Sequence, residues 1–208
     1  MTELRFETAN YFVRPLTKGD ISAAWGRWLL DPTTARLLNA SCRKQSRGEL
    51  EAYVDQFNNR DKILVGIFHR PTGEHVGIWT FVVSRGGSDV LANVVVGEDK
   101  FRSLSGLLEV KAIQTNIQNY LFVTRGFRSI CASIVAHNTK MVAYLKQQAG
   151  WELIRRTMSP PSASGEMVEL LLFRLTREAY LRRKGTSGVS RRSSKSGSDG
   201  YIDVGARL

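Results

Sequence analysis

Apolar residues recur at helical spacing in the first part of the chain. Ala23, Ala24, Trp28 and Leu29 follow a period close to 3.6 and predict a helix that ends at Pro32. Thr17 and Asp20 precede it with the spacing of a capping box. Two more helices are expected after it, one carrying Ala35, Leu37 and Leu38 and one over residues 47–57, which Ser46 would cap.

A change to strand-like patterns follows from Ile63 onward. The apolar runs Ile63–Phe68 and His75–Ser84 flank a turn at residues 70–74, which together predict a β-hairpin. A second turn, at residues 85–88, leads to a third buried run, Leu91–Val96. A short strand over residues 10–14 precedes the helices. These segments predict an antiparallel meander.

The segment after Val96 combines patterns typical of an anion site. A small-residue turn, Arg102–Gly106, leads into a helix whose apolar face starts at Leu107. A buried run, Ile130–Val135, comes next, and a further helix is expected between Asn138, which would cap it, and Gly150. Strand, loop, helix and strand in this order can aim helix N-terminal N–H groups at an anionic ligand.

The rest of the chain predicts strands over residues 151–158 and 167–175 and a short helix over residues 176–184. The Gly, Ser and Arg composition of residues 185–208 predicts a disordered basic tail. We therefore expect one α+β domain, residues 1–184, built on a mixed, mostly antiparallel sheet flanked by helices.

Charge and composition narrow the class of partner. The 208 residues carry 30 Lys and Arg against 19 Asp and Glu, a net charge of +11, which favours an anionic partner. Cys42 and Cys131 have no metal-site or redox spacing, and the three histidines are scattered, so no metal is expected. The sequence lacks a signal-peptide pattern and an apolar run of membrane-spanning length, which predicts a cytoplasmic protein without membrane contact.

The motifs together resemble those of the GCN5-related N-acetyltransferases, in particular the branch that acetylates ribosomal-protein N-termini. Arg14-Pro15-Leu16 with Asp20, Trp28 and Asp31-Pro32 is similar to this branch's opening. Residues 101–109 are similar to its central Y-R-G-x-G-L-A-T-E, and Asn138 with Gly150-Trp151 to its later N…G-F. The resemblance covers residues 11–175.

This resemblance implies an acyl-CoA N-acyltransferase fold with a splayed parallel strand pair, Leu91–Val96 and Ile130–Val135. It implies acetyl-CoA as cosubstrate and an amine, on a protein N-terminus or a small molecule, as acceptor. The residues it assigns to the cofactor are Val96, Arg102, Ser103, Leu104, Ser105, Gly106, Leu107 and Asn138. The loop departs from the family's Q/R-x-x-G-x-G/A at Ser105 and Leu107, and a one-residue slide would place Gly106 at the first small position but lose the arginine.

Two residues are candidates for proton transfer. The resemblance implies Tyr144 as general acid for the departing thiolate, with core packing as the alternative, and Glu98 lies at a strand end near the expected amine. The alternative function is a non-catalytic binding module, whose altered loop no longer holds coenzyme A and whose basic surface contacts nucleic acid or an acidic protein. Nucleic acid is not favoured, because Tyr201 is the only aromatic residue of the tail. A homodimer is a further possibility that the sequence leaves open.

Overall fold

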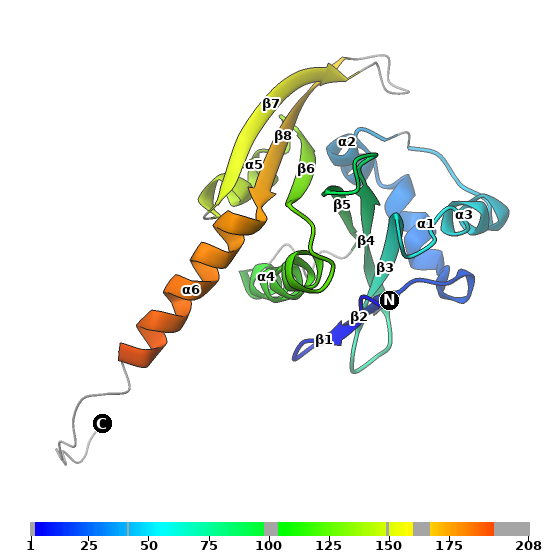
Figure 1. Ribbon diagram of the computed structural model, residues 1–208. Coiled ribbons are helices and arrows are strands. Elements are labelled where there is room, and N and C mark those ends of the chain that lie inside the picture. Colours follow the sequence, from blue (N-terminus) through cyan, green and yellow to red (C-terminus); the bar gives the residue numbers. More distant parts are fainter. Residues whose placement is uncertain (1–2, 41, 98–103, 149, 160–166, 194–208) are drawn as a thin grey trace, which may run out of the picture.

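A mixed eight-stranded sheet forms the centre of the computed structural model (Figure 1). The structure describes residues 3–40, 42–97, 104–148, 150–159 and 167–193, and only the backbone of residues 96, 104–107 and 186–193. The strands lie in the order β1-β2-β3-β4-β5-β6-β8-β7. Their bounds are β1 Phe6–Glu7, β2 Tyr11–Pro15, β3 Lys62–His69, β4 His75–Val83, β5 Asp89–Val96, β6 Ser129–Val135, β7 Trp151–Ser159 and β8 Val168–Thr176.

Helices cover both faces of this sheet. Their bounds are η1 Lys18–Asp20, α1 Ala23–Leu30, α2 Pro32–Leu38, α3 Arg47–Val54, α4 Leu104–Asn119, its π-helical continuation η3 Tyr120–Thr124, α5 Thr139–Gln147 and α6 Arg177–Ser193. Trp25 and Trp28 of α1 pack with Leu50 of α3 on Leu64 and Ile78 of the sheet. A second core cluster includes Ile113 and Ile117 of α4, and a third joins Leu145 of α5 to β6 and β8.

Strand pairing confirms the mixed, mostly antiparallel sheet. β2, β3, β4 and β5 form the expected meander, and β6 runs antiparallel to β8. The one parallel pair in the described sheet is β5 with β6. β1, which pairs with the start of β2, was not expected from the sequence, because two residues are too few to show a period.

The helix starts are set by side-chain caps. Thr17 and Asp20 form the expected capping box, but it caps only the single turn η1, and α1 begins later with Ser22 as its own cap. Ser46 caps α3 as predicted, with Glu49 completing the box. These local signals are short range, so the sequence places them well.

Two helix boundaries differ from the expectation. α4 begins at Leu104, so Leu104, Ser105 and Gly106, which the sequence placed in a turn, are in its first turn. α6 continues to Ser193 instead of ending at Lys184, so residues 185–193 are helical and not part of a disordered tail. A helix already started propagates at lower cost than it nucleates, which extends it through weak helix formers. Residues 194–208 lie outside the described residues.

Candidate functional site

The parallel strand pair opens into a gap within the sheet. β5 pairs with β6 only from Asp89 with Ser129 to Ala92 with Ala132. Beyond that point β5 stays paired with β4 as far as Val96, and β6 stays paired with β8 as far as Val135. The two strands therefore splay apart, as the resemblance implied. Between them, residues 93–96 and 133–135 present backbone groups with no strand partner on that side, which can hydrogen-bond an extended ligand.

A cavity of about 260 Å³ occupies this opening. Its wall is formed by α4, by α2 and α5 with a residue that caps each of them, and by residues of strands β4, β5, β6, β7 and β8. Its polar lining residues are Asn39, Asn93, Gln114, Gln118, Ser133, Asn138 and Tyr144. The others are mainly apolar and aromatic. A mostly apolar cavity with a few converging polar groups is the usual form of a small-molecule site.

Asn138 lies in the cavity wall at the start of α5. Its Oδ1 accepts a hydrogen bond from the backbone N–H of Met141 at 3.2 Å, so it caps the helix as predicted. Because Asn138 also lines the cavity, its amide N–H group is near any ligand bound there. A cap and a ligand contact are compatible in this position.

Tyr144 follows on the same helix and also lines the cavity. Its hydroxyl donates a hydrogen bond to Oε1 of Gln114 in α4. Burial raises the pKa of the Tyr144 hydroxyl, and the nearby Arg183 opposes this only in part. The group therefore stays protonated near neutral pH, which is the state that a general acid needs. The role of Tyr144 as general acid, with core packing as the alternative, stays a prediction.

Several predicted site residues either have only their backbone described or lie outside the described residues. Val96 ends β5 beside the opening, and residues 104–107 form the first turn of α4, where backbone N–H groups lack helical partners. Glu98, Arg102 and Ser103 lie outside the described residues. The assignment of a phosphate to this turn stays a prediction.

An aromatic cluster lies behind the last residues of β5. Trp28 packs so closely on Gly97 that a Cβ there would lie 1.8 Å from the indole Cε2. The His75 ring stacks on Phe68, with centroids 5.0 Å apart, and meets the edge of Trp28 at 5.2 Å. α1 thus fixes the point at which β5 leaves the sheet.

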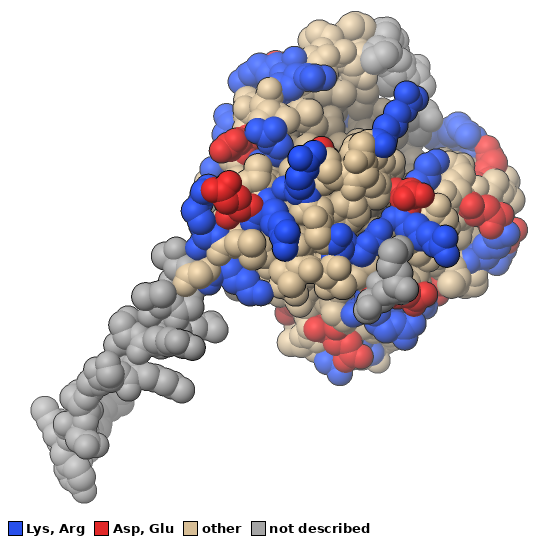
Figure 2. Space-filling view, in the orientation of Figure 1, with Lys and Arg blue, Asp and Glu red and all other residues tan. Residues whose placement is uncertain are grey.

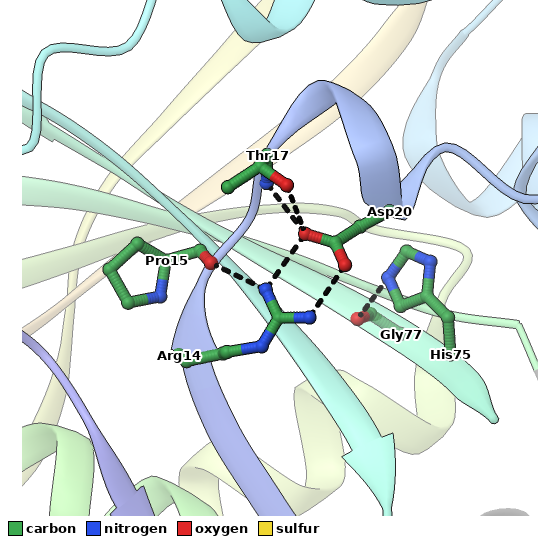
Figure 3. A network of polar contacts seen from close by, with 6 residues as sticks. All are labelled: Arg14, Pro15, Thr17, Asp20, His75 and Gly77. Atoms are coloured by element: carbon green, nitrogen blue, oxygen red, sulfur yellow. Dashed lines mark hydrogen bonds and ion pairs between the residues drawn. The ribbon is translucent and has the colours of Figure 1, made fainter. Parts of the chain in front are cut away.

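A bidentate ion pair supports this cluster (Figure 3). Arg14 donates to both carboxylate oxygens of Asp20, at 2.8 and 2.6 Å, and Thr17 donates to the same carboxylate through its N–H and its hydroxyl. The Arg14 hydrogen bond lowers the pKa of Asp20 to about 2. The guanidinium also lies 4.3 Å from the centre of the Phe68 ring, next to His75. The R-P-L-x-x-x-D motif is thus a structural brace.

His75 is buried inside this cluster with one ring nitrogen unpartnered. Nε2 lies 3.0 Å from the carbonyl oxygen of Gly77, which makes Nε2 the N–H donor, and His75 is 5% exposed. Among the described residues no polar group reaches Nδ1. Burial lowers the pKa of the imidazole. The neutral ring is therefore the form that fits.

Sequence reasoning missed the residues that α2 and α4 bring to the cavity. Asn39, in the left-handed conformation at the end of α2, donates to the hydroxyl of Ser159 at 3.0 Å. A separate hydrogen bond joins α2 to the β6–α5 loop, where Nε2 of His137 lies 3.0 Å from the carbonyl oxygen of Arg36. The sequence contained one indication of Gln114 as a site residue, since it is a polar residue next to the apolar stripe of α4. Asn39 had none, because its partners are distant in sequence.

No family model matches the chain, and no curated protein matches it by sequence. Solved structures do match its fold. A spermidine N-acetyltransferase from Vibrio cholerae, in complex with CoA and spermine, gives a TM-score of 0.68 at 11% identity, over 84% of this chain and 99% of that chain. The chain has the acyl-CoA N-acyltransferase fold. A GNAT-family acetyltransferase from Bacillus anthracis gives 0.67 at 12% identity, over 84% and 99% of the two chains.

A GCN5-related N-acetyltransferase from Brucella melitensis also gives 0.67 at 12% identity, over 86% of this chain and 81% of its own. At these identities the likenesses show the fold alone, and membership of the GCN5-related N-acetyltransferases and of their ribosomal-protein branch stays a prediction. Within the described part of this acyltransferase fold, no cluster of three or more His, Cys, Asp or Glu could hold a metal ion. None of the described helices combines the length and apolar character needed to cross a membrane.

Proposed function

We propose that this protein transfers an acetyl group from acetyl-CoA to an amine. The observation that carries the proposal is the opening between β5 and β6, where unpaired backbone at residues 93–96 borders a cavity. A pantetheine arm is extended and carries two amides, so it can pair with that strand edge as an added strand would. The first turn of α4 would then face the pyrophosphate with its free N–H groups.

The chemistry needs orientation and proton transfer only. The neutral amine nitrogen attacks the thioester carbonyl, the C–S bond breaks, and the departing thiolate takes a proton. Tyr144 is proposed to supply that proton, because it lines the cavity and its raised pKa keeps the hydroxyl protonated. Glu98 is proposed to accept the amine proton, from its place one residue after Gly97 in the sequence.

The acceptor is proposed to be an amine on a molecule that is otherwise neutral or anionic. One of these neighbours contains spermine, a polycation. Among the described residues here, the lining of the cavity includes no Asp or Glu, and the chain has a net charge of +11. Figure 2 shows Lys and Arg outnumbering Asp and Glu over β7, β8 and the start of α6. Such a field repels a polyamine and suits a peptide N-terminus or a mostly apolar amine.

Calorimetric titration with acetyl-CoA is the first test, paired with two variants that each lose a helix cap. Asn138→Ala and Ser46→Ala should each lower stability by about 1 kcal/mol. Only Asn138→Ala should also weaken acetyl-CoA binding, because Ser46 lies on α3, away from the cavity. No heat and no thermal shift with millimolar acetyl-CoA would overturn the proposal.

Transfer is tested by thiol release from acetyl-CoA with two acceptors, spermine and a neutral peptide with a free N-terminus. We expect the peptide to react faster. A higher kcat/KM for spermine would contradict the proposed acceptor class but not acetyl transfer itself. Binding of acetyl-CoA without thiol release to any amine would instead identify a non-catalytic binding module.

A further inference from the structure

A second hollow lies between α4, the end of α5 and the start of α6. Its volume is about 680 Å³, which is within the usual range for a small-molecule site. Helix α6 closes it by contacts with α4: Tyr180 is buried, and Lys184 donates to Oδ1 of Asn119 at 2.8 Å. The groove therefore exists because the C-terminal helix docks on the domain.

The charged residues that line the groove are all cationic. Lys111 comes from α4, and Arg183 and Lys184 come from α6, so three cations face one space. The other lining residues are six amide side chains, a threonine and a tyrosine, and none of the described lining residues is Asp or Glu. Amide N–H groups and hydroxyls add neutral donors to the three charges. Such a set matches an anion with several oxygen acceptors.

Two of the six lining amides are already oriented by the cations of α6. Nη2 of Arg183 donates to Oε1 of Gln118 at 2.8 Å, and Gln118 is 4% exposed. Oδ1 of Asn119 accepts from Lys184 and, at 3.4 Å, from the hydroxyl of Tyr180. Because the side-chain oxygens of Gln118 and Asn119 are engaged in this way, their NH₂ groups are the ends left to donate. The lining is thus arranged before any ligand enters.

The groove is next to the acetyl-transfer cavity but distinct from it. Gln114 and Gln118 line both hollows, and Gln114 accepts the hydrogen bond of Tyr144. One layer of α4 side chains therefore separates them. We infer that this groove binds a phosphate-bearing anion, either the phosphates of a separate small molecule or those of coenzyme A reaching over α4. This inference does not depend on acetyl transfer.

Inorganic pyrophosphate is the probe, titrated by calorimetry into the full chain. The groove variant is Lys111→Gln with Lys184→Gln. The control is Lys62→Gln with Lys140→Gln, which are exposed lysines outside the groove and cause the same change of net charge. We expect the groove variant to weaken pyrophosphate binding by about tenfold or more, because each charge-assisted contact that is lost lowers the affinity. The control should change it by less than about twofold.

Lys111→Gln alone keeps the Lys184 contact to Asn119, so it reports on binding if the double variant melts early. Repeating the titration with saturating acetyl-CoA separates the sources. Unchanged pyrophosphate binding indicates a separate ligand. Competition, together with weaker acetyl-CoA binding by the groove variant, indicates the phosphates of the cofactor. No pyrophosphate heat, or equal losses in the groove variant and the control, would overturn the inference.

Discussion

Trp28 of α1 and Gly97 at the end of β5 are in such close contact that glycine is required there. An added Cβ would lie 1.8 Å from Cε2 and 1.9 Å from Cδ2 of the indole. The indole is itself 5% exposed and surrounded by core residues, so it cannot move away. This contact joins the N-terminal helices to the strand that borders the cavity.

Gly97→Ala should therefore lower the free energy of unfolding by more than about 2 kcal/mol, as measured by urea denaturation. Gly86→Ala is the matched control, because a Cβ at Gly86 meets nothing within 4 Å, and its effect should stay within about 0.5 kcal/mol. Trp28→Leu should make Gly97→Ala less costly, since it frees the space. Equal effects of the two glycine variants would contradict the contact.

The Arg14–Asp20 pair should contribute measurably to stability. Asp20→Asn removes the charge from four hydrogen bonds, and the side chain is 13% exposed, so we expect a loss of about 1–3 kcal/mol. Asp55→Asn is the control: its pair with Lys18 is 58% exposed on the Asp55 side and should be worth less than about 0.5 kcal/mol. Thermal melts of both variants test the difference.

The Asp20 carboxylate should also make the free energy of unfolding depend on pH in the acid range. Its pKa is lowered to about 2 in the folded state, so its contribution is present above its ordinary pKa near 4 and is lost as pH falls toward 2. Asp20→Asn should lose less stability than the wild type over that interval. Urea midpoints at pH 4.5 and 3 would measure this, and parallel curves would rule it out.

His75 should make stability depend on pH nearer neutrality. Burial depresses its pKa, so the unfolded chain takes up a proton at a higher pH than the folded chain does. Stability is then full above the unfolded value of about 6.5 and declines as pH falls toward the folded pKa. Arg14 opposes protonation and Asp20 favours it, but both keep their charge throughout this interval.

His75→Phe should remove this part of the decline between pH 7.5 and 5.5, because phenylalanine keeps an aromatic ring but does not titrate. The control is His69→Phe, which makes the same substitution at the less buried histidine of the neighbouring strand. Urea midpoints across the interval are the measurement. A His75→Phe protein that retains the wild-type slope would show that another group titrates.

Tyr144→Phe should lower kcat for acetyl transfer by about 10²–10⁴-fold if the hydroxyl protonates the thiolate. KM for acetyl-CoA should change little, because the ring remains. Tyr53→Phe removes a hydroxyl from a largely buried tyrosine on α3, away from the cavity, and should leave kcat unchanged. If both variants keep full activity, Tyr144 only packs and hydrogen-bonds Gln114.

The order of strands and helices was readable from the sequence because it depends on local periodicity. The apolar run Leu91–Val96 corresponds to β5 and Ile130–Val135 to β6, within two residues at each end, although Leu91 is 37% exposed and not buried as expected. Ser46 and Asn138 were identified as caps because a cap lies within three residues of the N–H groups it binds. The start of α4 and the end of α6 were misplaced because Gly, Ser and Arg patterns do not mark helix ends uniquely.

The sequence by itself determined the α+β composition, the strand meander and the helix starts, since these follow from side-chain period and short-range hydrogen bonds. Tertiary structure alone decided which polar groups share a space. Gln114 meets Tyr144 across 30 positions, and Asn39 meets Ser159 across 120. The groove under α6 likewise unites Lys111 with Lys184. No local pattern encodes these pairs, because they form only when the sheet brings its flanking helices together.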